Sequence, residues 1–174
     1  IGTTKVATVV AKVAPTGSIE VLAFGRSVSD GMRKGLVVSP DELSDSVRRS
    51  VKEATAMLGR PLPSAHVGIT GGHLTCINAA ATISREPGKA ARAFSQADVD
   101  ELLMTTPPAD GPRQRVVHVV PRTFRVDGLS GVRNPIGMSG VKLSAESHVV
   151  LGDPAPMENL ARVAQGAGVK LAGI

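Results

Sequence analysis

The chain has 174 residues, of which 42% are apolar and 20% charged, a composition that is typical of a folded protein with a sizeable core and excludes a disordered chain. With three Phe and neither Trp nor Tyr, this core has to be built from aliphatic side chains. The net charge of +5 raises the question of nucleic acid, but no basic segment alternates with aromatic residues that could contact bases, so we expect a solvated basic surface and no nucleic-acid partner.

The single cysteine, Cys76, excludes a disulfide within the chain and fits a reducing compartment. It lies between the apolar residues Leu74 and Ile77, so we expect its thiol to be buried. No apolar stretch approaches the ~20 residues that span a bilayer, and we identify no secretory leader. Because the chain begins at Ile1 and not at Met, we expect that residues upstream of it are absent from this sequence.

The first segments predict two strands, a loop and a short third strand. Residues 5–13 are β-branched and partly alternating, and residues 19–28 follow a turn at 15–18, so the two strands are expected to pair. A basic loop at 32–34, between two glycines, precedes a short strand at 36–38.

The helix predicted at 39–58 has the clearest pattern. Its apolar side chains recur every three or four residues and form one stripe for packing on a sheet. They are Leu43, Val47, Val51, Ala54 and Leu58. Ser39 and Glu42 have the spacing of a capping box, and Pro40 suits the first helical position. Gly59 is expected to end the helix.

A buried strand is predicted at 66–70, in one sheet with the first two strands, and the character of the sequence then changes. The elements expected next are an apolar segment at 79–83, an exposed basic loop at 84–92, a helix capped by Ser95 and ended by Pro107 and Pro108, a strand at 115–126, an ordered loop at 127–138, a strand at 141–151 and a helix over 157–164. We therefore predict an α/β layer from residues 1–77 and 146–174, interrupted by an α+β insertion at 78–145.

The sequence has no constellation typical of a catalytic or metal site. Its four histidines are scattered beside apolar residues: His66, His73, His118 and His148. Neither zinc-ligand spacing nor a G-x-S-x-G nucleophile motif occurs, so we expect no catalytic residue and no metal ligand. Ser95, Asp98 and Glu101 are interpreted as helix-capping and first-turn residues.

One short segment suits a phosphate group: Gly2, Thr3, Thr4 and Lys5, just before the first predicted strand. Glycine lets backbone N–H groups approach an anion, hydroxyls can bond phosphate oxygens or water around a metal ion, and lysine adds positive charge. Taken alone, G-T-T-K fits a plain turn equally well. It is not a Walker loop, because the pattern G-x-x-x-x-G-K-[ST] is absent.

Longer strings give this segment a context. I-G-T-T-K, a Val-rich strand and I-E-V-L-A-F-G together resemble the first phosphate loop and hairpin of the superfamily that contains actin, sugar kinases and heat-shock chaperones. Within it, six strings resemble the bacterial cell-division family FtsA: G-M-R-K-G-L-V-V (31–38), V-G-I-T-G-G-H-L (67–74), V-V-H-V-V-P-R-T-F-R-V-D-G (116–128), G-V-R-N-P-I-G-M-S-G-V-K-L (131–143), E-S-H-V-V-L-G (146–152) and N-L-A-R-V-A-Q-G-A-G-V (159–169). They span nearly the whole chain in the order of the family.

The resemblance implies a fold and a role. The fold would be part of an actin-like (ribonuclease H-like) lobe, with a small α+β subdomain inserted at 78–145. The role would be that of an adaptor that binds ATP with Mg²⁺, polymerises, and links the ring of the tubulin-like protein FtsZ to the inner membrane, on its cytoplasmic face at the division septum. It implies at most a weak ATPase.

The resemblance also assigns parts of this role to parts of the chain. Gly2, Thr3, Thr4 and Lys5 would bind ATP, weakly or not at all in this chain alone because they form one wall of a cleft between two lobes. The inserted subdomain would mediate self-association and recruit later division proteins. FtsZ would be bound through parts that this chain does not contain.

Two alternatives stay open. One is an adaptor similar to PilM, the actin-like protein of type IV pilus assembly, although the string N-P-I-G-M-S-G argues against it. The other is a phosphotransferase of the same superfamily, such as a sugar kinase. That reaction needs a general base, and no Asp or Glu here lies in a recognisable base motif.

Two arginines of the insertion are candidate partner-binding residues. If the strand continues to Val126, Phe124 and Val126 face the core together with Arg122. Arg125 then faces solvent, and Arg133, in a loop rich in Gly and Pro, is also expected to be exposed. Both arginines fit ordinary surface charges equally well.

Overall fold

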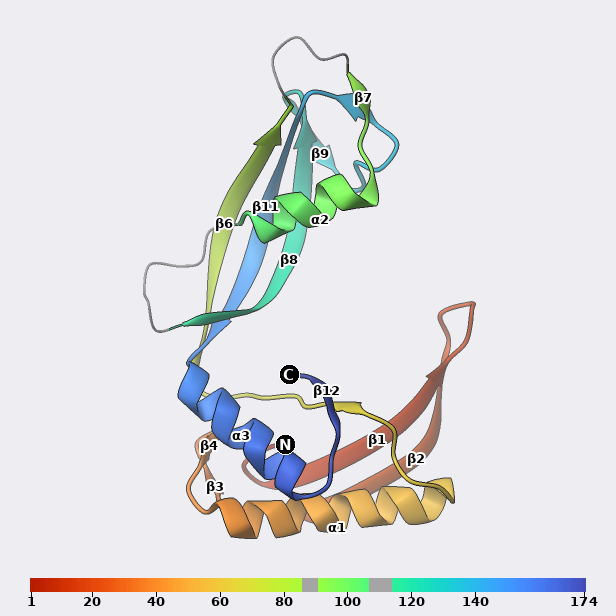
Figure 1. Cartoon of the computed structure of the whole chain (residues 1–174), viewed down its shortest axis with the longest axis vertical. Coiled ribbons are helices and arrows are strands. Elements are labelled where there is room, and N and C mark those ends of the chain that lie inside the picture. The colour runs from red at the N-terminus through yellow and green to blue at the C-terminus, as the bar shows by residue number, and fades with distance from the viewer. Residues whose placement is uncertain (86–90, 107–113) are drawn as a thin grey trace. The chain divides into compact units, whose positions relative to one another are not determined.

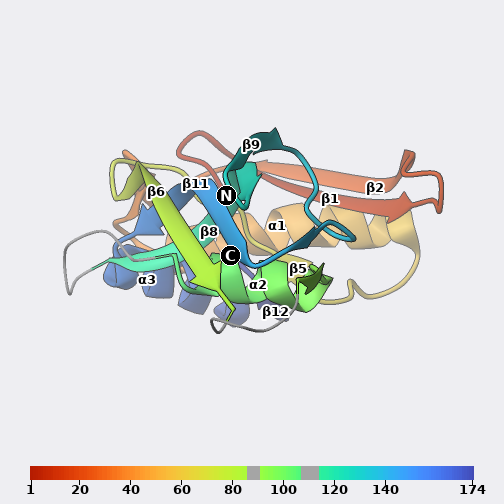
Figure 2. The same cartoon turned by 90° about the horizontal axis from the view of Figure 1, so that it is seen from above.

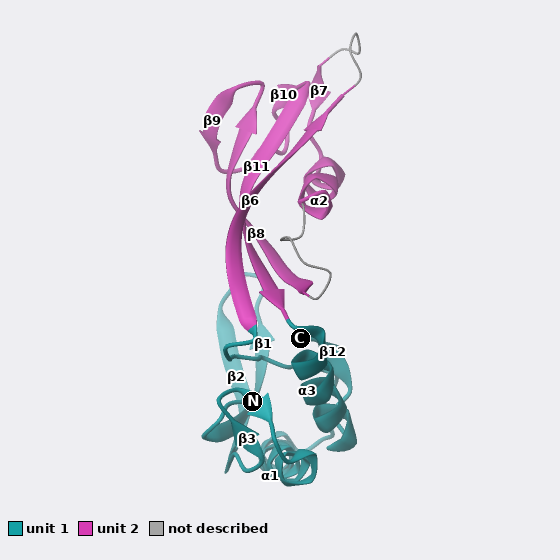
Figure 3. Ribbon diagram, turned by 90° about the vertical axis from the view of Figure 1, so that its left-hand side faces the viewer, with its two compact units in different colours: residues 1–73, 153–174 teal, residues 74–152 magenta. Residues whose placement is uncertain are grey.

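The computed structural model describes residues 1–85, 91–106 and 114–174. The chain divides into two compact units, one formed by residues 1–73 with 153–174 and the other by residues 74–152 (Figure 3). The division expected from the sequence, at 77/78 and 145/146, is therefore displaced at both ends. The reason is that two long strands of unit 2 pair along their whole length, from Leu74 with Gly152 to Ser84 with Lys142.

Unit 1 begins with an antiparallel hairpin, β1 (Lys5–Val13) and β2 (Ile19–Val28), as the alternating sequence predicts. The helix α1 (Pro40–Leu58) packs along this hairpin (Figures 1 and 2). It approaches β2 so closely that a Cβ on Gly25 would lie 2.1 Å from the carbonyl oxygen of Ser50. Glycine at this position therefore sets the distance between helix and strand.

The two ends of α1 differ from each other in how well the sequence predicts them. Gly59 ends the helix in the left-handed conformation, with φ of 73°, as expected. The predicted capping box is wrong, because the Ser39 side chain makes no capping hydrogen bond. The N-terminus is stabilised instead by Pro40, whose missing N–H needs no partner, and by Asp41 and Glu42 near the positive end of the helix dipole.

The remaining elements of unit 1 are the hairpin of β3 (Met32–Arg33) and β4 (Leu36–Val37), the strand β5 (Ala65–His66), the helix α3 (Pro154–Gly166) and the strand β12 (Leu171–Gly173). Contrary to the prediction, the strand near 66–70 is short and does not join the sheet of β1 and β2. It pairs in parallel with β12, a strand that the sequence pattern does not indicate. The core of the unit lies between α1, α3 and these strands, around Leu43, Val47 and Leu160.

Unit 2 is a four-stranded antiparallel sheet in the order β6 (Leu74–Ser84), β11 (Lys142–Gly152), β8 (Arg115–Val126) and β9 (Leu129–Val132). One face is covered by the helix α2 (Gln96–Met104), and the short strands β7 (Arg92–Ala93) and β10 (Ser139–Gly140) pair beside it (Figure 1). The side chains between sheet and helix form a second core: Ala81, Phe94, Val99, Leu102, Phe124, Val126, Leu143 and Ala145.

Three expectations for unit 2 are corrected. Cys76 is exposed, because it lies five positions from the buried Ala81 on β6 and so points to the opposite face. The segment predicted as a loop at 127–138 contains β9, which follows a tight turn where Asp127 and Gly128 both have positive φ. Arg122 does not share the buried face of Phe124, because the register of β8 shifts at this residue.

Candidate functional site

The predicted phosphate loop lies in unit 1, immediately before β1. The N–H of Gly2 donates to the carbonyl of Lys5 at 3.0 Å, so that residues 2–5 form a tight turn. The side chains of Thr3, Thr4 and Lys5 are exposed. The turn therefore presents two hydroxyl groups and one ammonium group to the solvent.

The hairpin of β3 and β4 supports this loop, a contact that the sequence does not predict. The N–H of Gly35 donates to Thr3 Oγ1 at 3.2 Å. Lys34 and Gly35 have φ of 49° and 81°, the left-handed pair that turns a two-residue hairpin. A Cβ on Gly35 would lie 2.4 Å from the carbonyl oxygen of Thr70, so only glycine fits. The K-G dipeptide indicates the turn, but nothing in the spacing indicates that the turn meets Thr3.

The chemistry of the loop fits phosphate oxygens. Its threonine hydroxyl groups and the Lys5 ammonium are donors, and it contains no carboxylate, whereas the Gly2 N–H is already used within the turn. Within the described ranges, no three His, Cys, Asp or Glu side chains form a group that could hold a metal ion.

The two arginines predicted to bind a partner, Arg125 and Arg133, are both exposed on unit 2. Arg125 extends from β8, and its Nε donates to Ser130 Oγ at 3.0 Å. It borders a hollow of about 250 Å³ on the sheet face opposite α2, together with Lys142 and Glu146. Both arginines lie in unit 2, and the phosphate loop lies in unit 1.

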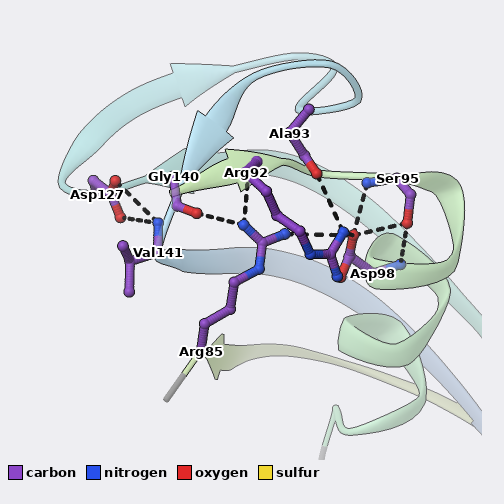
Figure 4. A network of polar contacts seen from close by, with 8 residues as sticks. All are labelled: Arg85, Arg92, Ala93, Ser95, Asp98, Asp127, Gly140 and Val141. Atoms are coloured by element: carbon purple, nitrogen blue, oxygen red, sulfur yellow. Dashed lines mark hydrogen bonds and ion pairs between the residues drawn. The ribbon is translucent and has the colours of Figure 1, made fainter. Parts of the chain in front are cut away.

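A third cluster, in unit 2, connects the end of the sheet to β7 and α2 (Figure 4). Arg92 donates to both carboxylate oxygens of Asp98, at 2.9 and 3.3 Å. Arg85 Nη1 donates to the carbonyl oxygens of Arg92 and Gly140, and its guanidinium lies 4.1 Å from the centroid of the Phe94 ring. Arg85 Nη2 is 3.6 Å from Asp98 Oδ2.

Asp98 also completes a capping box at the start of α2. Its carboxylate accepts from the Ser95 N–H and hydroxyl, both at 2.7 Å, and its own N–H donates to Ser95 Oγ. The Ser95 N–H and hydroxyl, with Arg92, hold the pKa of Asp98 at about 2. The capping role expected from the sequence is confirmed, whereas the ion pairs were not predicted.

Arg85 corrects the prediction of an exposed basic loop at 84–92, whereas Arg92, whose side chain is 62% exposed, agrees with it. The side chain of Arg85 is only 14% exposed. Residues 86–90 of that loop, like Pro107 and Pro108 after α2, lie outside the described residues. A pocket of about 330 Å³ adjoins the cluster, and its lining contains the two arginines and two acidic residues, Asp98 and Glu101. Since the charges are balanced within the pocket, we interpret the cluster as a support for β7 and α2.

Comparisons with known proteins relate both units to one family. Residues 71–151 match the family described as the SHS2 domain inserted in FtsA. Over 98% of its length the chain is 34% identical to the cell division protein FtsA of Pseudomonas aeruginosa and 29% identical to that of Escherichia coli K12. Over 97% it is 30% identical to FtsA of Borreliella burgdorferi. The chain spans about 40% of the length of these relatives.

A solved structure of the PilM–PilN type IV pilus biogenesis complex is also similar. The similar region comprises 99% of this chain and 44% of the solved chain. The TM-score is 0.60 at 12% sequence identity, which indicates a shared fold. The predicted fold class, part of an actin-like lobe with an inserted α+β subdomain, is confirmed. No helix among the described residues is long and apolar enough to cross a membrane. By the domain match and by its similarity to FtsA along almost its whole length, the chain belongs to the FtsA family of cell-division proteins.

Proposed function

We propose that this chain is part of a cell-division adaptor that polymerises and links the FtsZ ring to the cytoplasmic face of the inner membrane. In this role, unit 2 contacts other proteins and unit 1 supplies one wall of an ATP site. The observation that carries the proposal is the match of residues 71–151 to the domain inserted in FtsA, in a unit with a core of its own. The fold likeness to PilM supports no second function.

The partner surface of unit 2 is proposed to lie around Arg125 and Arg133. Both side chains are exposed, and Lys142 adds a third positive charge near Arg125. Such a surface fits an acidic segment of a later division protein, because opposite charges at the rim of an interface accelerate association. Arg125→Glu with Arg133→Glu should therefore weaken the binding of an acidic peptide, and more strongly at low salt.

This test needs a matched control and a clear reading. Arg60→Glu with Arg162→Glu reverses two charges on unit 1, of which Arg162 is 76% exposed, and should leave peptide binding unchanged. A pull-down with the acidic peptide, at low and at high salt, compares the two double variants. Equal binding by both variants would place the partner surface elsewhere on the protein.

The ATP site is proposed to include Gly2, Thr3, Thr4 and Lys5, with ATP bound as its Mg²⁺ complex. Thr4 and Lys5 are exposed, and the contact of Thr3 with Gly35 fixes the turn. The chain supplies a single wall of the site, so the missing contacts should cost several factors of ten in affinity, each worth about 1.4 kcal/mol. Calorimetry should accordingly give no micromolar dissociation constant, and such a constant with 1:1 stoichiometry would refute the single-wall proposal.

Weak binding can still be located. Titration with Mg-ATP to millimolar concentration should change the amide NMR shifts of residues 2–5 and of Gly35. Lys5→Ala should remove these changes, whereas Lys12→Ala, at the exposed far end of β1, should not. Shift changes confined to other residues would contradict the assignment of the site.

A further inference from the structure

The phosphate loop at residues 2–5 meets a second basic segment, the tip of the β3–β4 hairpin. The contact is the hydrogen bond that the Gly35 N–H donates to Thr3 Oγ1, at 3.2 Å. Because Thr3 Oγ1 accepts this bond, its own hydroxyl proton can still be donated to a phosphate oxygen. The contact therefore places Lys34, the residue before Gly35, beside a group that is expected to bind phosphate.

Close backbone packing holds the hairpin tip in this place. A Cβ on Gly35 would lie 2.4 Å from the Thr70 carbonyl oxygen and 2.7 Å from the Gly71 Cα, so the tip is pressed against these two residues. Lys34 and Gly35 have φ of 49° and 81°, which makes the turn a tight two-residue one. The backbone position of Lys34 is thus fixed by the turn and by the segment behind it.

From this position the Lys34 side chain can reach a phosphate group bound at Thr3. Covalent geometry places the Lys34 Cα about 2.4 Å from the Gly35 nitrogen, and hence less than about 6 Å from Thr3 Oγ1. A lysine ammonium extends up to about 6 Å from its Cα on a flexible four-carbon stem. The side chain is exposed, and in the part of the chain that the structure describes it forms no ion pair that would hold it elsewhere.

The segments that meet here carry cations and no carboxylate. The loop supplies Lys5, and residues 31–38, G-M-R-K-G-L-V-V, supply Arg33 and Lys34. Residues 67–72, V-G-I-T-G-G, which pack against the tip, are uncharged. Coulomb attraction grows with the charge of the ligand, so three cations without a carboxylate favour a chain of several phosphate groups over a single one.

We propose that Lys34 is a further phosphate-binding residue, and that it binds a polyphosphate chain together with Thr3 and Lys5. The proposal rests on the proposed ATP site and deepens it, because it extends the site from the phosphate loop to the hairpin and assigns the polyphosphate chain as the part of the ligand that is recognised. Inorganic tripolyphosphate carries such a chain without the adenosine, so it probes these contacts alone.

The test is an amide NMR titration of the whole chain with inorganic tripolyphosphate and, separately, with orthophosphate. Lys34→Gln removes the charge but nearly keeps the length of the side chain. It should weaken tripolyphosphate binding about five- to tenfold and orthophosphate binding less, with a smaller difference at high salt. Lys34→Arg should restore the affinity. Lys12→Ala, which removes an exposed lysine at the far end of β1, is the control and should bind like the unaltered chain.

The outcomes distinguish a failure of Lys34 from a failure of the ATP site. If tripolyphosphate shifts no amide of residues 2–5 in the unaltered chain, the proposed ATP site is itself wrong. If it shifts these amides and Lys34→Gln binds with unaltered affinity, the ATP site stands and the role of Lys34 is overturned. A loss of affinity that Lys34→Arg does not restore would also overturn it, because the effect would then come from the turn and not from the charge.

Discussion

The two units attach a helix to strands in different ways. In unit 1, hydroxyl groups join α1 to the hairpin beside the apolar contacts: Ser50 Oγ donates to the Gly25 carbonyl at 3.0 Å and lies 2.8 Å from Thr8 Oγ1, and Ser27 Oγ donates to the Ser46 carbonyl at 2.6 Å. In unit 2, α2 contacts the sheet through apolar side chains, among them Leu102. The first contact depends on the closeness of two backbones, and the second on the volume of the side chains between them.

The units also differ in how they cover their strands. On β1 and β2 many large apolar side chains are exposed: Val9, Val13, Ile19, Val21, Leu22, Phe24 and Val28. On the sheet of unit 2 the comparable residues are Val116, Val120 and Leu129. Unit 1 therefore leaves more apolar strand surface exposed than unit 2 does. We therefore expect the stability of unit 1 to fall most when atoms are added between α1 and β2, and that of unit 2 to fall most when atoms are removed from the core under α2.

The largest effect is expected where an atom is added to unit 1. In Gly25→Ala the new Cβ would lie 2.1 Å from the Ser50 carbonyl oxygen and 2.6 Å from the Ala54 nitrogen, so α1 has to move. We expect a loss of about 3 kcal/mol or more in the stability of unit 1. Amide hydrogen exchange of α1 measures it.

The control for this prediction is Gly68→Ala. Its Cβ would have no heavy atom within 4 Å, so we expect almost no change. Equal protection of α1 in the two variants would show that the close approach at Gly25 does not determine the position of the helix.

The next largest effect is expected where atoms are removed from unit 2. Leu102 is fully buried, and Leu102→Ala should cost about 2–5 kcal/mol through lost contacts and a cavity. Hydrogen exchange should accelerate in the strands of unit 2. Met104→Ala, two residues further on and 85% exposed, should change stability by less than about 0.5 kcal/mol. A similar loss in both variants would contradict a core centred under α2.

A smaller, pH-dependent effect is expected from the ion pairs of unit 2. The pKa of Asp98 is lowered from 3.8 to about 2 in the folded state. The stabilisation by this carboxylate is therefore complete well above pH 3.8 and disappears as the pH falls through about 2. The N–H groups of Lys142 and Val141 lower the pKa of Asp127 in the same direction.

Asp98→Asn isolates this contribution. The variant should be less stable at neutral pH, because Arg92 loses a charged partner, and should lose less stability than the unaltered chain between pH 4 and pH 2. Asp100→Asn, at an exposed position of the same helix, is the control. Thermal unfolding at several pH values gives the comparison, and parallel curves for the unaltered chain and Asp98→Asn would exclude Asp98 as the titrating group.

The smallest effect is expected at the proposed partner surface. Arg125→Glu with Arg133→Glu should change the stability of unit 2 by about 0.5 kcal/mol or less per site, because both side chains are exposed. The melting temperature should stay within a few degrees of the unaltered value. A larger drop would mean that the contact of Arg125 with Ser130 supports the fold, and would weaken a pure binding role.

The sequence by itself determined the elements whose signal is local. The repeat of apolar residues set α1, the alternation of β1 and β2 set the first hairpin, and Ser95 with Asp98 marked the start of α2. The resemblance to FtsA depended on strings of consecutive residues, and the domain match and the relatives agree with it. Signals of this kind need no partner from elsewhere in the chain.

Only the tertiary structure decided contacts between residues far apart in the sequence. It paired β5 with β12, placed Gly35 against Thr3 and buried Arg85 beside Asp98. These contacts depend on packing distances that periodicity does not contain. The exposure of Cys76 also depends on tertiary structure. The face of β6 that is buried is the one on which α2 packs, and α2 comes later in the chain.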